Sequence, residues 1–268
     1  MSKFIARRLV LSAAVVAVLG RAQPQIFPKE FDVATVKANA ANDNRFMIRP
    51  LPGGGLTITG VPLKMLIMEA YDVRTFQVSG GPGWMNTERW DIQAKAEGVQ
   101  GQLPIGQMLK MLQALITDRF KLEVHHESKE MTVYALVVGK NGSKLTPHTG
   151  EPPQPTDRLR MRPGSLSAKQ VRIAALVRQL TPQLGRQVID KTGLTGEYDF
   201  TLEWTPEPGQ GGPESIGLPP ALDSPRASDS NGPSIFTALQ EQLGLRLDAQ
   251  KGPVDVIVID RAEKPDEN

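Results

Sequence analysis

The chain has 268 residues, 40% of them hydrophobic, which is enough for one large or two small domains with a sizeable core. It has no cysteine, which excludes disulfides, thiolate metal sites and a lipid-modified export signal. Residues 1–22 hold four of the 31 basic side chains and none of the 29 acidic ones, so the remainder carries a net charge of −2 and lacks the basic surplus of a nucleic-acid-binding protein.

Residues 1–22 are predicted to be a signal peptide. Lys3, Arg7 and Arg8 precede an apolar run at residues 9–19, and Gly20-Arg21-Ala22 fits a small-x-small cleavage site. The run is shorter than the roughly 20 residues that cross a bilayer, so no stable membrane span is expected after cleavage. An uncleaved anchor is the alternative. The expected location is the periplasm, or outside the cell, of a Gram-negative type bacterium, and the lack of cysteine suits an oxidising compartment.

Residues 23–139 are predicted to form a first lobe. Alternating apolar residues indicate strands, and an apolar stripe at helical spacing over residues 105–116 indicates a helix. That stripe favours core packing over a partner groove. The triple glycine at 53–55 favours a hairpin turn, because the spacing of a phosphate loop is missing. The expected elements are strands 31–37, 45–49 and 56–59, helix 62–71, strands 76–78 and 90–95, helix 105–120, and strands 121–125 and 131–138.

Residues 140–164 are polar, contain five prolines, and are predicted to be a linker. A second lobe follows at residues 165–263. It includes a Gly/Pro/Ser-rich flexible excursion at 206–233, and a polar tail at 264–268 ends the chain. The expected elements are strand 165–167, helix 171–184, strands 187–190 and 198–203, helix 235–243, and strands 245–249 and 254–259. Pro182 is expected to end or kink its helix.

The two lobes look like copies of one unit. Trp90-Asp91-Ile92 matches Tyr198-Asp199-Phe200 at an offset of 108 residues, and Leu122 and Met131 match Leu245 and Val254 at an offset of 123. Each unit therefore reads β-α-β-β-α-β-β. The predicted fold class is α+β, with two tandem lobes of split β-α-β type, each a mixed or antiparallel sheet with two helices on one face.

Several motifs together resemble a family of exported proteins of unknown function that is expanded in soil acidobacteria, the Solibacter-type paralogous family. Similar domains also occur fused to antibiotic-sensor-type membrane metallopeptidases. The resemblance covers nearly all of residues 31–268 and implies no catalytic residues, because the family has no established activity. The motifs are residues 31–37, Tyr71, residues 79–84, 89–92, 111–115, 118–122 and 190–200, and Lys264-Pro265.

The sequence offers little for catalysis. Asp190-Lys191-Thr192-Gly193 is the tetrapeptide of phosphorylated ion pumps, but a turn built by Asp190 or Thr192, with Gly193 and Gly196 at positive φ, is favoured. His125 and His126 are adjacent on a strand and point to opposite faces, His148 lies in the linker, and no metal or cofactor is expected. No nucleophile motif occurs.

Repeat-equivalent Asp91 and Asp199 could share a cleft and do acid/base chemistry. Structural pairing with Arg89 or Arg119 is the favoured alternative for these carboxylates.

Four aromatic residues are the candidate ligand-binding side chains, although core packing is the favoured role for each: Trp84, Trp90, Tyr198 and Trp204. An open sheet edge that accepts a partner's strand is a further binding mode.

The predicted function is a non-enzymatic extracytoplasmic interaction or sensor-type module, with an envelope protein or peptide as partner. The alternatives are a hydrolase with a carboxylate-based site at the lobe junction and a structural envelope component. Perturbed carboxylates or histidines in one deep pocket would favour the enzyme, and an exposed edge strand on a pocketless surface would favour the module.

Overall fold

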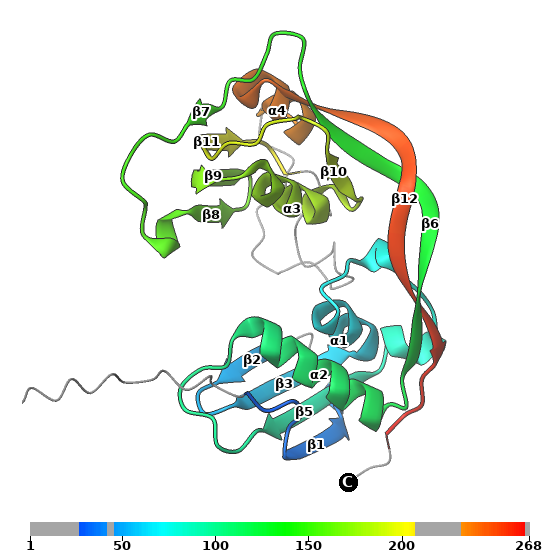
Figure 1. The fold of residues 1–268 in the computed structure, drawn as a ribbon. Coiled ribbons are helices and arrows are strands. Elements are labelled where there is room, and N and C mark those ends of the chain that lie inside the picture. The colour runs from blue at the N-terminus through cyan, green and yellow to red at the C-terminus, as the bar shows by residue number, and fades with distance from the viewer. Residues whose placement is uncertain (1–26, 42–45, 207–231, 266–268) are drawn as a thin grey trace, which may run out of the picture.

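A computed structural model describes residues 27–41, 46–206 and 232–265. Helices and several sheets are both present, which confirms the α+β prediction. Two compact blocks are joined by a long two-stranded ribbon (Figure 1). The predicted signal peptide lies outside the described residues, as does nearly all of the predicted excursion.

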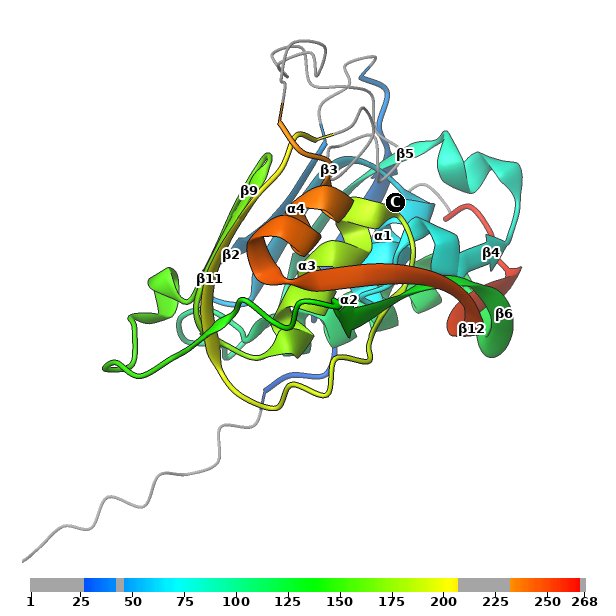
Figure 2. The same ribbon diagram turned by 90° about the horizontal axis from the view of Figure 1, so that it is seen from above.

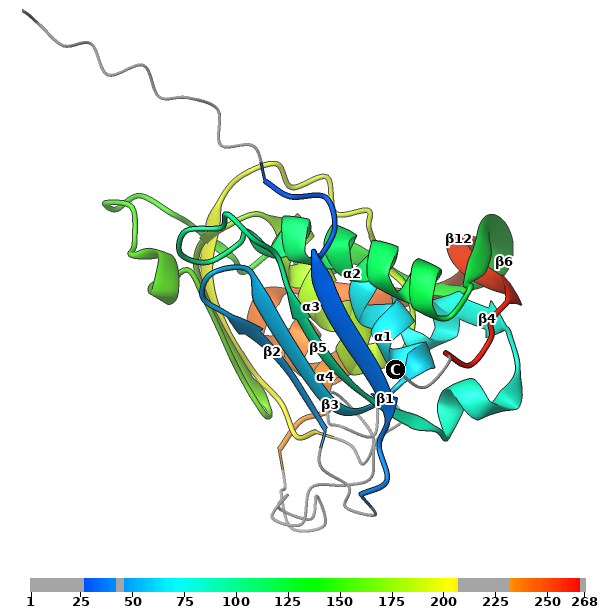
Figure 3. The same ribbon diagram turned by 90° about the horizontal axis from the view of Figure 1, so that it is seen from below.

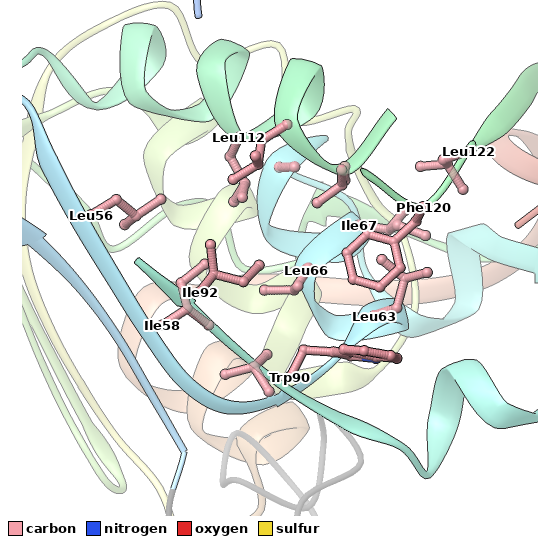
Figure 4. Packing of buried hydrophobic residues seen from close by; sticks show 14 of the residues in the cluster. Leu56, Ile58, Leu63, Leu66, Ile67, Trp90, Ile92, Leu112, Phe120 and Leu122 are labelled. Atoms are coloured by element: carbon pink, nitrogen blue, oxygen red, sulfur yellow. The ribbon is translucent and has the colours of Figure 1, made fainter. Parts of the chain in front are cut away.

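The first block is a four-stranded antiparallel sheet in the order β1-β5-β3-β2, with two helices on one face (Figure 3). Its apolar strand positions alternate, so Leu56, Ile58 and Ile92 all face the helices. They pack with Leu112 of the second helix into one core cluster (Figure 4). The elements are β1 (Val33–Ala38), β2 (Met47–Leu51), β3 (Gly55–Pro62), α1 (Leu63–Ala70), β5 (Arg89–Lys95) and α2 (Ile105–Arg119).

The second block repeats this plan in the order β7-β11-β9-β8, and its helices lie between the sheet and the ribbon (Figure 2). Residues 140–164, predicted as a linker, supply two of its strands. Helix α3 continues past Pro182 and ends before Gly185, which has φ +59°. The elements are β7 (Thr146–Pro147), β8 (Leu159–Arg162), β9 (Ser165–Val171), α3 (Ile173–Leu184), β11 (Tyr198–Glu203) and α4 (Ile235–Leu243).

The ribbon consists of β6 (Glu123–Val138) and β12 (Leu245–Arg261), which pair antiparallel along their whole length. Each was predicted as two short strands, and that prediction is wrong. The polar stretch in the middle of each strand looks like a turn in the sequence, but it is the part of the ribbon that crosses between the blocks. Extended backbone tolerates exposed polar side chains there because the two strands satisfy each other's hydrogen bonds.

Each strand of the ribbon starts at one block and ends in the other: β6 ends in the second block and β12 ends in the first. Leu136 of β6 is buried in the core of the second block, whereas Ile259 of β12, at 4% exposure, is buried in the core of the first. Two short strands complete this sheet, since β4 (Val78–Gly80) pairs in parallel with β12 and β10 (Val188–Asp190) pairs in parallel with β6. The core of each block therefore contains the end of a strand that follows, in the sequence, a helix of the other block.

Two glycines at the end of β4, Gly80 and Gly81, allow β12 to approach closely. A Cβ on Gly80 would lie 2.6 Å from the carbonyl oxygen of Ile259, and Gly80 has φ +78°. Gly81 is similarly close to Met85 and donates its N–H to the same Ile259 carbonyl over 3.2 Å. Only glycine fits both the left-handed backbone and this contact.

The described residues also contain three short 3-10 helices, η1 (Thr75–Gln77), η2 (Gly83–Asn86) and η3 (Pro155–Asp157). The expected strand 76–78 thus begins only at Val78, and Trp84 lies in η2. One exposed ion pair links the blocks directly, with Arg178 Nη2 of α3 3.9 Å from Asp72. Such a pair stabilises little, so the ribbon is the main connection.

Candidate functional site

The four candidate aromatic residues lie in two separate cores. Trp84 and Trp90 meet in the first block, with ring centroids 6.2 Å apart, and Trp90 also packs edge-on against Phe120 at 5.2 Å (Figure 4). Tyr198 and Trp204 belong to the core of the second block. The structure therefore brings the first two together and leaves the other two in a different block.

Burial limits what these rings can contact. Trp90 is 4% exposed and Trp204 is 6% exposed, and neither indole N–H meets a hydrogen-bond acceptor within the described part of the chain. Trp84 is half-buried, and Lys264 Nζ lies 6.0 Å from its ring centroid while also bonding Glu88 over 2.6 Å. Core packing accounts for these contacts, and Lys264 anchors the start of the predicted tail.

The equivalent carboxylates hold equivalent backbone irregularities. Asp91 accepts hydrogen bonds from the backbone N–H of Gly60 and from Asn39 Nδ2, both over 2.8 Å. Gly60 has φ +65° and sits where the pairing of β3 with β5 shifts register. Arg119, one of the cationic partners considered from sequence, instead lies 3.5 Å from Asp118.

Asp199 accepts the corresponding hydrogen bonds in the second block. It accepts from the backbone N–H of Gln170 over 2.8 Å and from His148 Nδ1 over 2.9 Å, and Gln170 has φ +52°. The two carboxylates therefore lie on different sheets, and each accepts a hydrogen bond from the amide of a residue at positive φ. Their contacts are structural, and Asp91 on β5 and Asp199 on β11 do not face a common cleft in the described part of the chain.

His148 and Asp199 form a pair with shifted titration. The hydrogen bond to Asp199 raises the pKa of His148 above its ordinary 6.5. Burial pushes the pKa of Asp199 up, but the hydrogen bonds from Gln170 and His148 outweigh burial and hold that pKa below 3.8. His148 Nε2 is buried and makes no hydrogen bond. Among the described residues, therefore, no serine or threonine hydroxyl is bonded to His148 as the nucleophile of a Ser-His-Asp triad would be.

The other histidines occupy opposite faces of the ribbon, as their adjacency predicted. His125 Nδ1 lies 2.8 Å from Asp260, and His126 Nδ1 lies 3.2 Å from Asp255. Both pairs are exposed, and across residues 27–41, 46–206 and 232–265 no group of three or more His, Asp or Glu side chains is arranged to hold a metal ion.

Two glycine-containing motifs form turns. Asp190 Oδ1 accepts from the N–H and the hydroxyl of Thr192 over 2.9 and 2.8 Å, and Gly193 has φ +71°, as expected for a structural turn. The expectation of positive φ at Gly196 is wrong. Gly53 and Gly54, both at positive φ, make the hairpin between β2 and β3.

The described surface has an apolar groove at one edge of the first block, between edge strand β2 and the two helices. Its volume is about 360 Å³. Ile105 on its rim is 63% exposed, so its side chain is available for contact. The groove is lined by Phe46, Ile48, Pro50, Leu56, Met65, Glu69, Ile105, Met108, Leu109 and Leu112.

The helical stripe explains how the groove arises. Met108 and Leu112 are buried against the sheet, as a core stripe predicts, whereas Ile105 is exposed and Leu109 is half-buried. These two residues line the groove together with Ile48 and Pro50 of β2, the last strand of the sheet on that side. The apolar stripe in the sequence therefore includes residues that the core does not cover.

A second hollow of about 330 Å³ lies where α4 meets β12 and is lined mostly by polar side chains. It includes Phe236, Gln240 and Arg246, and Arg246 is engaged by Asp248 over 2.7 Å. Neither hollow contains a histidine or the Asp91 and Asp199 carboxylates. No helix within the described residues has the length and apolar character needed to cross a membrane.

Comparison with known proteins identifies a family. The family model described as "Protein of unknown function (DUF3738)" matches residues 64–262, a range that contains α2 and all but the first residue of α1 and begins after β3. No curated protein and no solved structure matches the chain significantly.

Proposed function

Because the chain belongs to the DUF3738 family, whose description assigns no function, we propose its role from its surface: it is a non-enzymatic interaction module. It takes apolar side chains of a partner envelope protein or peptide into the groove between β2, α1 and α2. The observation that carries this proposal is an open apolar hollow rimmed by a 63%-exposed isoleucine. Concave hollows lined mainly by apolar side chains are common binding sites in folded proteins.

The composition of the groove suits peptide recognition. Met65 and Met108 have flexible, polarisable side chains that adapt to different apolar partners. Glu69 is the single charged residue of the lining and is exposed, so it can select a partner by charge without being buried. The polar groups that chemistry would need, His148 and Asp199, are on the other block.

The proposed setting is outside the cytoplasm. The signal-like residues 1–22, with a basic start and an apolar run, support export, and the absence of cysteine is compatible with the periplasm. We also propose that the chain is one of the acidobacterial paralogues that its motifs resemble. The sensor-type role follows from the fused metallopeptidases of that family, in which similar domains would receive an extracytoplasmic partner.

A photo-crosslinking amino acid at position 105 tests the groove. In envelope extract it should capture one partner in stoichiometric yield, and the crosslink should map to an apolar segment of that partner. The matched control carries the same group at exposed Lys110, which is on α2 but outside the groove lining. Equal capture from both positions would contradict the proposal.

Turnover in a hydrolase substrate screen would instead support the alternative enzyme. In that case, activity lost on replacing Asp91 or Asp199 without loss of folding would locate the chemistry at the carboxylates. Activity that survives both replacements would place it elsewhere.

A further inference from the structure

We infer that the partner segment binds as an extended strand added to the outer edge of β2, which has no second partner strand among the described residues, with apolar side chains at alternate positions entering the groove. This inference rests on the proposed function, since it names the conformation and pattern of the partner at that same groove. Strand addition supplies main-chain hydrogen bonds for affinity and pockets for alternate side chains for specificity. Three features of β2 support it.

The first feature is the direction of the backbone groups in β3. Ala96 donates its N–H to the carbonyl of Gly54, across the Gly55–Lys95 pair. In an antiparallel ladder this makes Gly55–Lys95 a non-hydrogen-bonded pair, and the adjoining pair at Leu56 the hydrogen-bonded one. Leu56 therefore directs its N–H and carbonyl toward β5.

The alternation then fixes the direction of the groups in β2. Thr57, one residue along β3, directs its backbone groups toward β2, where it pairs with Arg49. Arg49 accordingly points back at β3, and its neighbours Ile48 and Pro50 direct their backbone groups away from the sheet. The N–H and carbonyl of Ile48 and the carbonyl of Pro50 are thus aimed outward from this edge.

The second feature is that the same residues line the groove. Phe46, Ile48 and Pro50 turn their side chains into it. A guest residue opposite Ile48 in a hydrogen-bonded pair would place its own side chain on the same face, and therefore in the groove. Guest residues two positions before and after it would also place their side chains in the groove. The residues between them would place theirs on the opposite face of the sheet, beside Arg49 and Met47.

The third feature is the presence of Pro50 and Glu69, which limit the length and the charge of the guest strand. Proline tolerates an edge position because its nitrogen, which has no hydrogen, faces away from the sheet. Pro50 can accept but cannot donate, so the guest ladder is short and centred on Ile48. Exposed Glu69 is the only charged residue among those that line the groove. Its charge favours a basic residue on the guest strand where the strand passes Glu69.

The test uses the full mature chain and a labelled peptide of about six residues, a typical strand length, with alternating valine and threonine and one terminal lysine. A control peptide has the same composition with the valines adjacent. A second control is N-methylated on its backbone. Affinity is measured by fluorescence anisotropy, and amide exchange at Ile48 is followed by NMR with and without peptide.

We expect only the alternating peptide to bind, and to slow exchange of the Ile48 amide. Ile48→Pro, which removes an outward N–H but no β2–β3 hydrogen bond, should weaken binding about tenfold or more. Arg49→Ala, on the opposite face, should leave affinity unchanged. Ile105→Asp at the rim should also weaken binding, and circular dichroism checks that each variant is folded.

Each other outcome overturns strand addition. If an amphipathic helical peptide binds, loses affinity with Ile105→Asp and ignores Ile48→Pro, the groove binds partners but not as strands, and the proposed function survives. If no peptide binds and the position-105 crosslinker also captures nothing, both proposals fail. If the Ile48 amide is already protected without peptide, another segment of this chain occupies the edge.

Discussion

Replacing Ile259 with alanine should loosen the first block, although the residue lies near the C-terminus. Its side chain is 4% exposed and packs in the core cluster of β3, β5, α1 and α2. The mirror change, Leu136→Ala, should loosen the second block, because Leu136 is fully buried there. The pair tests whether the ends of the ribbon are exchanged between blocks.

The size of the effect follows from the atoms removed. Either change deletes three carbons, which at about 0.8 kcal/mol each gives about 2.4 kcal/mol of lost burial. An incompletely relaxed cavity adds roughly 1 kcal/mol, so each variant should lose about 3 kcal/mol of unfolding free energy. For a chain of this size that is a fall in Tm of about 6–12 °C.

Hydrogen exchange followed by mass spectrometry locates the loss. Ile259→Ala should speed exchange in α1 and β5 more than in β9 and β11, and Leu136→Ala should do the reverse. Val33→Ala, at a 60%-exposed site on β1, is the control and should change stability by less than about 0.5 kcal/mol. Faster exchange in the second block of the Ile259 variant would refute the exchanged arrangement.

Three further outcomes are expected. Gly80→Ala should cost at least about 2 kcal/mol, because it combines positive φ with a clash against β12, whereas Gly83→Ala, where a Cβ meets open space, should stay within about 0.5 kcal/mol; urea denaturation of both variants measures the contrast. Asp91→Ala should cost about 2 kcal/mol, because it leaves a buried backbone amide unpaired, and a Tm unchanged from wild type would contradict that role. For His148 the folded-state pKa is raised, so its contribution is fully present below pH 6.5 and is lost as pH rises through the folded-state value. Asp199 has a lowered pKa, so its contribution is present above pH 3.8 and is lost as pH falls through the folded-state value. His148→Asn, which copies the asparagine found at the equivalent site of the first block, should flatten the decline of the urea midpoint above pH 6.5; an unchanged slope would exclude this pair as its cause.

Local patterns in the sequence predicted most individual elements. Alternation placed the strands that contain Leu56, Ile92 and Phe200, and the stripe from Ile105 to Ile116 placed α2, because burial on one face imposes a period of two or 3.6 residues. The turn at Asp190 was also predicted correctly, since its side chain bonds the backbone two residues on. These features depend on neighbours in the chain.

The candidate site could be predicted only in part from the sequence. The methionine and leucine stripe was recognised, with a partner groove as the less favoured interpretation, yet which of its residues stay open depends on where the sheet ends. Ile105 is 63% exposed while Leu112 is buried, a difference that arises only once the helix is packed on the sheet β1-β5-β3-β2. The aromatic residues were plausible ligands by type, and packing placed them in two cores.

By itself, the sequence determined the class of fold, the helices and most strands, and the absence of cysteine chemistry, because these depend on composition and on periodicity along the chain. Only the tertiary structure decided that residues 123–138 and 245–261 each form one strand, and that each strand ends in the other block. Pairing between positions more than 100 residues apart leaves no local periodicity in either strand. The position of β2 at the edge of its sheet has the same origin, since it depends on which of the described strands pair with one another.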